Sequence, residues 1–237
     1  MPGISHRWDL SPEEAAALQR DLATKAERQN RLGPVKLVAG IDVSVRDDAG
    51  RAAIVVLDFE RLSPVEYAVA TRPITFPYIP GLLSFREGPA ALEALAQLKT
   101  TPDLLMVDGH GLAHPRRFGI ASHLGLLADL PSIGCAKSRL VGRHDEPGQE
   151  VGNYAPLVDR GEVIGAVLRT RPGVSPVFVS IGHRIDLATS IQTVLACCRG
   201  YRLPETTRWA HRVAGGEKPP LRGQPGVEAI QPALFDL

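Results

Sequence analysis

The sequence predicts a mixed α/β fold, and three observations support this fold class. Three strand-like runs follow one another between residues 35 and 74 with only short turns between them. Two short, fully apolar runs at 104–107 and 132–136 come later, separated by a segment with helical character. Closely joined strands pair antiparallel, whereas strands joined through helices pair parallel. A sheet with both kinds of pairing is therefore expected.

A helix followed by an antiparallel meander is predicted to begin the fold. Ser11 can cap the helix, Pro12 suits its first turn, and Glu14 completes a capping box. The meander strands are expected at 35–45, 52–59 and 65–74, with a turn at 47–50 and an irregular loop at 77–81 after them.

The rest of the domain is predicted to alternate strands and helices. The strands are expected at 104–107, 132–136, 162–169 and 176–181, the last two as a pair, and the helices at 89–98, 121–128, 187–198 and 205–213. A meander followed by such alternation is the order of elements in ribonuclease H-like domains, which place helices on both faces of a mixed sheet.

One domain is expected over 1–214, followed by a flexible tail over 215–237 that is rich in Gly and Pro. The charged, glycine-containing segment 142–152 is expected to be a mobile surface loop.

The composition is that of an ordinary globular protein. The 237 residues are 44% hydrophobic and 22% charged, with no apolar run of transmembrane length and no recognisable signal peptide. Three cysteines, two of them adjacent, do not suggest a disulfide framework, so a cytoplasmic protein with reduced thiols is expected. The formal net charge of +1 neither indicates nor excludes a nucleic-acid partner, so any basic surface must be local.

Two carboxylates occupy positions where an unpaired charge would be costly. Asp42 lies inside an apolar strand, on the face opposite Ile41 and Val43, and Asp108 follows the buried run 104–107. If the two strands are neighbours, the carboxylates lie within about 5 Å of each other, which is one strand spacing. Facing carboxylates repel unless a cation lies between them, and hard oxygen ligands suit magnesium or manganese.

The chemistry that such a site favours is metal-assisted hydrolysis. Two ions can activate water and stabilise the leaving oxygen of a phosphodiester. The alternatives are a buried salt bridge for Asp42 and an ordinary Asp-Gly turn for Asp108. Spacing alone does not select Glu87, which could be a solvated charge near a helix start.

Four separated motifs resemble those of the endonuclease V family, which acts on deoxyinosine in DNA. They are VAGIDVS at 38–44, PYIPGLLSFRE at 77–87, DGHGLAHPR at 108–116 and GCAKSRL at 134–140. The resemblance runs from Val38 to His211 and implies a ribonuclease H-like fold.

The resemblance also implies roles for individual residues. Asp42, Glu87 and Asp108 match the metal-binding carboxylates of the family, and His211 matches a fourth active-site position that helps to hold or orient a second metal. Lys137 matches a lysine near the scissile phosphate, where an ammonium can neutralise developing charge. The alternatives are a surface histidine at a helix end and a solvated lysine.

A strand-separating wedge and a base pocket are implied as well. The stiff loop Tyr78, Ile79, Pro80 and Gly81 resembles the wedge of the family; the alternative is a proline turn packed on the core. The family turns the damaged base out of the helix into a pocket. By matched motif, the candidates to line this pocket are Gly81, Leu83, Gly109, His114, Ile120 and Leu140.

Several other polar residues are candidates for contacts with the nucleic acid. His110 could reach the metal or a phosphate, whereas His114 could simply anchor its loop. The arginines that could contact phosphates, or else be solvated, are Arg86, Arg116, Arg117, Arg139 and Arg143.

Together these features predict a magnesium-dependent DNA repair endonuclease, with manganese as a substitute metal. By resemblance, it recognises deoxyinosine and hydrolyses the second phosphodiester bond 3′ to the lesion, which leaves 3′-hydroxyl and 5′-phosphate ends. Asp42 and Asp108 would hold the metal that generates hydroxide. Two alternatives remain open: an endoribonuclease specific for inosine in RNA that uses the same site, and a non-catalytic protein that binds damaged DNA.

A protein partner is suggested by the C-terminus. Gln231, Leu234 and Phe235 resemble the short peptide with which bacterial proteins bind the replication sliding clamp. The alternative is that Leu234 and Phe235 pack back on the domain.

Overall fold

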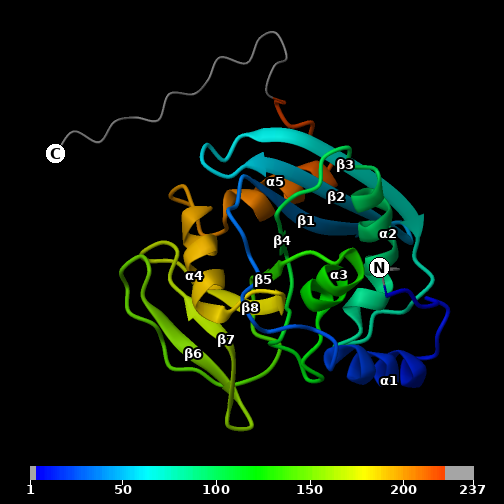
Figure 1. Ribbon diagram of the computed structural model, residues 1–237, viewed down its shortest axis with the longest axis horizontal. Helices are drawn as coiled ribbons and strands as arrows, with labels where there is room; N and C mark the ends of the chain where they lie inside the picture. Colours follow the sequence, from blue (N-terminus) through cyan, green and yellow to red (C-terminus); the bar gives the residue numbers. More distant parts are fainter. Residues whose placement is uncertain (1–3, 222–237) are drawn as a thin grey trace.

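Helix α1 (Pro12–Ala23) begins as its sequence predicts. The Ser11 hydroxyl accepts a hydrogen bond from the Glu14 amide, and the Glu14 carboxylate accepts one from the Ser11 amide, so the capping box is formed. The computed structural model describes residues 4–221 (Figure 1). The segment 231–235, with its predicted clamp contact, lies outside the described residues. Within them, no helix combines the length and the apolar character needed to cross a membrane.

The strands form one sheet with the predicted mixture of pairings. Its antiparallel meander consists of β1 (Leu37–Arg46), β2 (Ala49–Asp58) and β3 (Pro64–Pro73). Two parallel strands lie next to β1, first β4 (Leu104–Val107) and then β5 (Ser132–Ala136). The sheet ends with the antiparallel strands β8 (Val177–His183), β7 (Glu162–Leu168) and β6 (Tyr154–Asp159). The full order is β3-β2-β1-β4-β5-β8-β7-β6, which confirms the predicted fold class.

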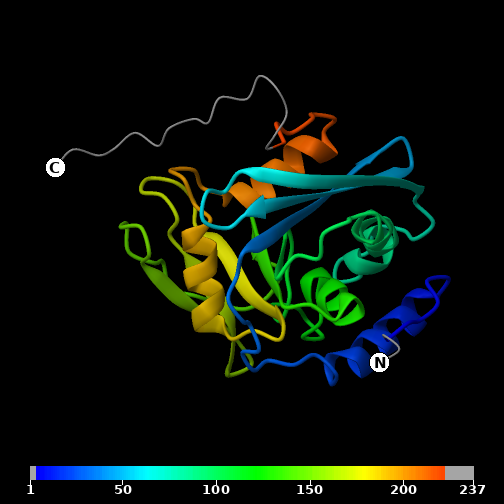
Figure 2. The same cartoon turned by 45° about the horizontal axis from the view of Figure 1, so that its top comes forward.

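Helices cover both faces of the sheet, because side chains along each strand alternate between the faces (Figures 1 and 2). On the face to which Ile41 points, the buried core is shared with α2 (Leu83–Ala96) and α3 (Ile120–Ala128). On the face to which Val38 points, it is shared with α4 (Leu187–Ala196) and α5 (Glu205–Ala214).

Helix α2 begins earlier than the sequence predicts. Its first residue is Leu83 rather than residue 89, and Pro89 lies inside the helix. The first turn is held because Phe85 packs with Phe76 and with Ala15 of α1 in a buried cluster. Tertiary packing here outweighs the backbone hydrogen bond that a proline cannot donate. Glu87 is therefore a residue of the helix and does not precede it.

Two strand predictions are also corrected. The turn before β2 is two residues shorter, because Asp47 and Asp48 both adopt the left-handed conformation, at φ 48° and 55°, and reverse the chain by themselves. Strand β6 has no counterpart in the prediction, because Pro156 interrupts its pattern. Proline is tolerated there since β6 is at the edge of the sheet.

The loop 142–152 is irregular as predicted, but a buried arginine anchors it. The Arg169 side chain is 3% exposed, and its Nη2 lies 2.5 Å from Oε1 of Glu146. Its Nε also donates to the Gly148 carbonyl at 3.2 Å. These bonds tie the loop to the strand end, which argues against a loose surface segment.

Helix α5 lies very close to the sheet where it crosses β1. A Cβ atom built on Gly40 would lie 2.0 Å from the carbonyl oxygen of Thr206, so this position has no room for a side chain. Thr206 is in the first turn of α5, and Gly40 is two residues before Asp42. The contact therefore sets how closely α5 lies over the residues that follow in β1.

We expect Gly40→Ala to destabilise the protein by about 1–3 kcal/mol, because the added methyl group must displace helix backbone. Gly33→Ala is the matched control, since a Cβ at Gly33 meets nothing within 4 Å. Denaturant unfolding of both variants measures the difference. Equal free energies of unfolding for the two variants would contradict this packing argument.

Candidate active site

Asp42 and Asp108 lie side by side in the middle of the sheet. Ile41 of β1 pairs with Val107 of β4, and the Asp108 amide donates to the Ile41 carbonyl at 2.9 Å. The two side chains are nearly buried, at 12% and 10% exposure. The parallel pairing thus brings both carboxylates to the carboxyl end of β4, which is where ligands bind in α/β proteins.

Each of these carboxylates contacts a nitrogen from another element. Nδ1 of His211 in α5 lies 2.7 Å from Oδ2 of Asp42. Nζ of Lys137, which directly follows β5, lies 2.5 Å from Oδ2 of Asp108. The fold explains both contacts, because α5 packs across β1 and β5 is the neighbour of β4. All four residues were expected at one site, and the structure places them there.

Glu87 belongs to the same electrostatic group. Burial, together with repulsion by Asp42 and Asp108, raises the pKa of its carboxyl to about 8. Burial and the charge of Asp42 also raise the pKa of Asp108, against the opposing effect of Lys137. A solvated charge near a helix start, the alternative for Glu87, does not fit this environment.

The donor set fits a hard divalent cation. Three carboxylates in one region of low dielectric repel one another, and oxygen ligands of this kind suit Mg²⁺ or Mn²⁺. As the side chains stand, no three Asp, Glu, His or Cys groups among residues 4–221 form a ready cluster for an ion. Lys137 contacts Oδ2 of Asp108 and His211 contacts Oδ2 of Asp42, so one oxygen of each carboxylate already has a partner.

A cavity of about 290 Å³ adjoins Asp108. All the predicted wedge and pocket residues line it, namely Tyr78, Ile79, Pro80, Gly81, Leu83, Gly109, His114, Ile120 and Leu140. Asp108 and Lys137 also line it, whereas Asp42, Glu87 and His211 do not. The ring of Tyr78 is 69% exposed, which does not fit the alternative of a proline turn packed on the core.

His114 holds the wedge loop in place through both of its ring nitrogens. A carbonyl can only accept, so Nε2 carries the hydrogen and donates to Gly81 at 2.9 Å, while Nδ1 accepts from the Arg116 amide at 3.1 Å. Burial lowers the pKa of His114 to about 4, so the ring is neutral near pH 7. Because both ring nitrogens are hydrogen-bonded within the protein, His114 contributes to the pocket by anchoring the loop to which it belongs.

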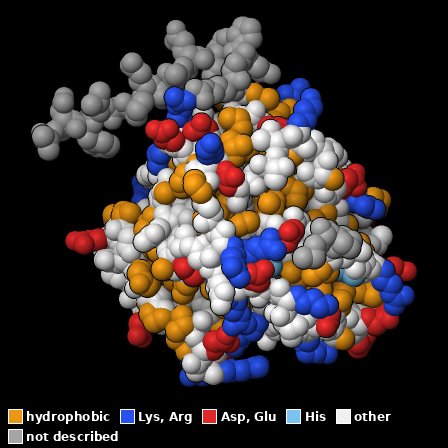
Figure 3. Space-filling view, viewed as in Figure 1, with side chains coloured by type: hydrophobic (Ala, Val, Ile, Leu, Met, Phe, Trp, Pro, Cys, Tyr) orange, Lys and Arg blue, Asp and Glu red, His pale blue; other side chains and the backbone are white. Residues whose placement is uncertain are grey.

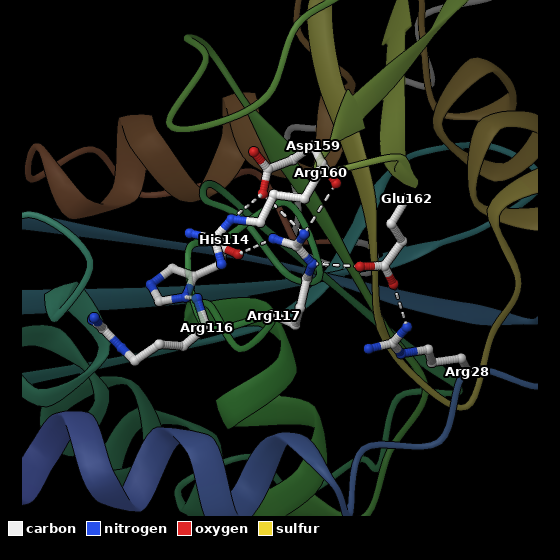
Figure 4. Close-up of polar contacts among 7 residues, drawn as sticks. All are labelled: Arg28, His114, Arg116, Arg117, Asp159, Arg160 and Glu162. Atoms are coloured by element: carbon white, nitrogen blue, oxygen red, sulfur yellow. Dashed lines mark hydrogen bonds and ion pairs between the residues drawn. The ribbon is translucent and has the colours of Figure 1, made fainter.

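Arg117 links this loop to the hairpin of β6 and β7, as Figure 4 shows. Its guanidinium lies 2.9 Å from Oδ2 of Asp159 and 2.6 Å from Oε2 of Glu162, and it donates to the His114 carbonyl at 2.9 Å. Arg28 contacts the other oxygen of Glu162 at 2.7 Å. Its donors are thus used within the protein, whereas the sequence analysis considered a phosphate contact or a solvated charge for Arg117.

Three of the other residues considered for contacts with nucleic acid also have internal partners. Arg116 donates to the Gly81 carbonyl at 2.6 Å, and Arg86 donates to the Phe76 carbonyl at 3.0 Å. His110 contacts the Ser138 carbonyl. Arg139 lines the cavity and remains a candidate for a phosphate contact.

Gln19 is a pocket residue that the sequence analysis misses. Its Oε1 accepts from Nε of Arg116 at 2.5 Å, and its Nε2 donates to the Phe118 carbonyl at 3.1 Å. It is 1% exposed and lines the cavity. The available signal was a polar residue on the apolar face of α1, between the buried Ala15 and Leu22.

Basic and acidic side chains are interspersed on the face shown in Figure 3, where neither sign covers a continuous area. Several of the arginines are paired, as in the contacts of Arg184 with Glu27 and Asp129. This agrees with the formal net charge of +1 and with the expectation that any basic surface is local.

Comparisons with known proteins agree on one family. The sequence profile described as Endonuclease V matches residues 17–212. Endonuclease V of Roseiflexus sp. (strain RS-1) is 58% identical over 207 residues, which are 87% of this chain and 93% of that protein. The crystal structure of endonuclease V from Streptomyces avermitilis has a TM-score of 0.85 at 44% identity and covers 91% of this chain and 96% of its own.

A nucleic-acid complex is among the similar structures. It is that of endonuclease V from Ciona intestinalis with a 24mer DNA containing an inosine followed by a ribo-adenosine. The TM-score is 0.76 at 29% identity, over 86% of this chain and 95% of that one. These likenesses agree with the ribonuclease H-like order of the strands.

The raised pKa of Glu87 predicts a pH dependence of stability without divalent ions. The folded chain holds this proton up to about pH 8, whereas the ordinary pKa is 4.5. The stabilisation is therefore complete below pH 4.5 and lost as the pH rises through about 8. We expect the free energy of unfolding to fall over this range in EDTA, and to fall less in Glu87→Gln.

Urea unfolding at several pH values measures this effect. Glu93→Gln, an exposed change on the same helix, is the control and should follow the wild type. If the free energy of unfolding of the wild type and of Glu87→Gln changed with pH in parallel, the raised pKa of Glu87 would be contradicted.

Proposed function

The chain belongs to the endonuclease V family, and we propose that Asp42, Glu87 and Asp108 hold magnesium for the hydrolysis of DNA beside deoxyinosine. Family membership makes the chain an endonuclease of a generally metal-dependent kind. It therefore argues against the alternative of a non-catalytic binder of damaged DNA. The observation that carries the proposal is the adjacent placement of Asp42 and Asp108, of which Asp108 lines the cavity of about 290 Å³.

Recognition of deoxyinosine is supported by the relative from Ciona intestinalis, whose complex contains an inosine. An enzyme that reads one base must take it out of the stack and enclose it. The cavity beside Asp108 is lined by the exposed Tyr78 and by several glycines, whose backbone groups a base can approach closely. We assign the wedge to Tyr78, Ile79, Pro80 and Gly81.

The pocket has no free ring nitrogen at His114, because both are bonded within the protein. We therefore assign the reading of the hypoxanthine edge to backbone groups. Candidates lie at Gly81, Leu83, Gly109, Ile120 and Leu140, which line the cavity with His114. Backbone amides and carbonyls can distinguish the 6-carbonyl and N1–H of hypoxanthine from the groups of adenine.

The mechanism divides the work among a few side chains. Asp42 and Asp108 would be the ligands of the first metal, with Glu87 beside them. A divalent ion bound there supplies an activated water and stabilises the departing oxygen. His211 donates from Nδ1 to Oδ2 of Asp42 and so fixes the orientation of the Asp42 carboxylate.

Lys137 is placed to act on the phosphate. Its ammonium lies 2.5 Å from Asp108 and is 38% exposed, and the residue also lines the cavity. With Asp108 engaged as a metal ligand, the ammonium of Lys137 would be free to turn to the phosphate and to stabilise the charge that develops there. We propose that cleavage occurs at the second phosphodiester 3′ to the lesion and leaves 3′-hydroxyl and 5′-phosphate ends.

Inosine in RNA remains the alternative substrate. The strand bound by the Ciona intestinalis relative carries a ribo-adenosine directly after the inosine, so a ribose is accommodated there in that protein. Parallel cleavage of matched DNA and RNA oligonucleotides decides between the two substrates, because only the 2′-hydroxyl differs.

We expect the wild type to nick an inosine-containing duplex in magnesium or manganese and to leave the adenine-containing duplex intact. Asp108→Asn should lose at least about 100-fold in rate, since even a residue that only orients a metal ligand is worth 10- to 100-fold. Asp129→Asn, at the exposed end of α3, is the matched control and should keep full activity. An intact inosine strand with either metal would overturn the proposal.

A further inference from the structure

The segment after β5 is held by its backbone at the active-site lysine and at the residue that follows it. The Lys137 carbonyl accepts from Nη2 of Arg202 at 2.5 Å. The next carbonyl, that of Ser138, accepts from Nε2 of His110 at 2.9 Å. Two consecutive carbonyls are thus fixed by two side chains that come from different parts of the chain.

Arg202 is itself firmly placed between α4 and α5. Its Nε donates to the Ser175 carbonyl at 2.8 Å, and Nη2 donates to the Pro176 carbonyl at 3.0 Å. Its own carbonyl accepts from the Thr170 hydroxyl at 2.5 Å. The guanidinium therefore joins the segment before β8 to the segment after β5, in the planar fork that suits several acceptors at once.

His110 contacts the Ser138 carbonyl through one ring nitrogen, Nε2. The Ser138 carbonyl can only accept, so Nε2 must carry the ring hydrogen. Nδ1 is buried and has no hydrogen-bond partner among the residues that the structure describes. The one hydrogen bond of this ring is thus directed at the backbone beside Lys137, although His110 follows Asp108 by two residues.

The ammonium of Lys137 depends on this backbone. It reaches Asp108 at 2.5 Å from a segment that belongs to no helix or strand beyond Ala136. A long, flexible side chain can be aimed only if its own backbone is fixed. Arg202 and His110 supply that fixation, and Arg202 does not line the cavity that we assign to the base.

We propose that Arg202 and His110 are positioning residues that aim Lys137 at the scissile phosphate. The proposal rests on the role given above to Lys137. Arg202 lies away from the cavity and acts only through the Lys137 carbonyl, whereas His110 lines the cavity and acts on Lys137 through its bond to the Ser138 carbonyl. Loss of Arg202 lets the segment move and withdraws the ammonium in the transition state, whereas binding of the damaged base is kept.

The test compares Arg202→Met, Lys137→Met and the double variant on an inosine-containing duplex in saturating magnesium. Arg202→Met should lower kcat by about 10- to 100-fold, the range found for residues that orient an active-site group, with little change in KM. In the Lys137→Met background, Arg202→Met should cost nothing further, because the group that it aims is already absent.

Arg199→Met is the matched control. Arg199 lies three residues earlier and also donates to backbone carbonyls, those of Ala196 and Cys198, but has no bond to the segment after β5. It should keep the wild-type kcat. Arg202→Lys can bond fewer of the three carbonyls and should fall between the wild type and Arg202→Met. His110→Ala should lower kcat, and His110→Asn, which retains an N–H donor, should restore part of it.

The outcomes separate this inference from the proposed function. Full activity of Lys137→Met overturns the role of Lys137 and the inference with it. A large loss in Lys137→Met together with a wild-type kcat in Arg202→Met and Arg202→Lys overturns the inference alone. Losses that multiply in the double variant, or a loss confined to KM, also overturn it, because Arg202 would then act independently of Lys137.

Discussion

The repulsion among three half-buried carboxylates is the constraint on which the rest of the site depends. Burial and the nearby charges of Asp42 and Asp108 together raise the pKa of Glu87 to about 8. Such a group is unfavourable in a folded chain without compensation. Lys137 and His211 provide part of it in the structure, and the metal ion proposed above would provide the rest.

The fold concentrates these charges by close packing around β1. The parallel pairing with β4 places Asp108 beside Asp42, and the absence of a side chain at Gly40 lets α5 approach until His211 reaches Asp42. On the pocket side, a chain of internal bonds through His114, Arg116 and Arg117 fixes the wedge loop. These three side chains are of types that could bind nucleic acid, but here they hold the backbone of the loops that line the cavity.

The sequence predicts the acidic pair well and the supporting network poorly. Asp42 and Asp108 could be proposed from burial cost, because an acid in an apolar strand needs a partner. Glu87 could be selected only through its motif, since the local pattern places the start of α2 six residues too late. Gln19 and Arg202 act through tertiary contacts that no sequence spacing reveals. The order of charged residues along the chain likewise does not show which arginines have partners within the protein. Strand β6 was not predicted because it contains Pro156, which a strand tolerates at the edge of a sheet.

The central claim is that the three carboxylates form a cation site, and proton release on metal binding tests it most directly. At pH 7 Glu87 is mostly protonated, so a divalent ion must displace its proton. Calorimetric titration with magnesium or manganese, in buffers of different ionisation enthalpy, counts the protons released. The account predicts release that approaches one proton per chain in the wild type and none in Glu87→Gln. Metal binding with no proton release, or with equal release from both proteins, would contradict it.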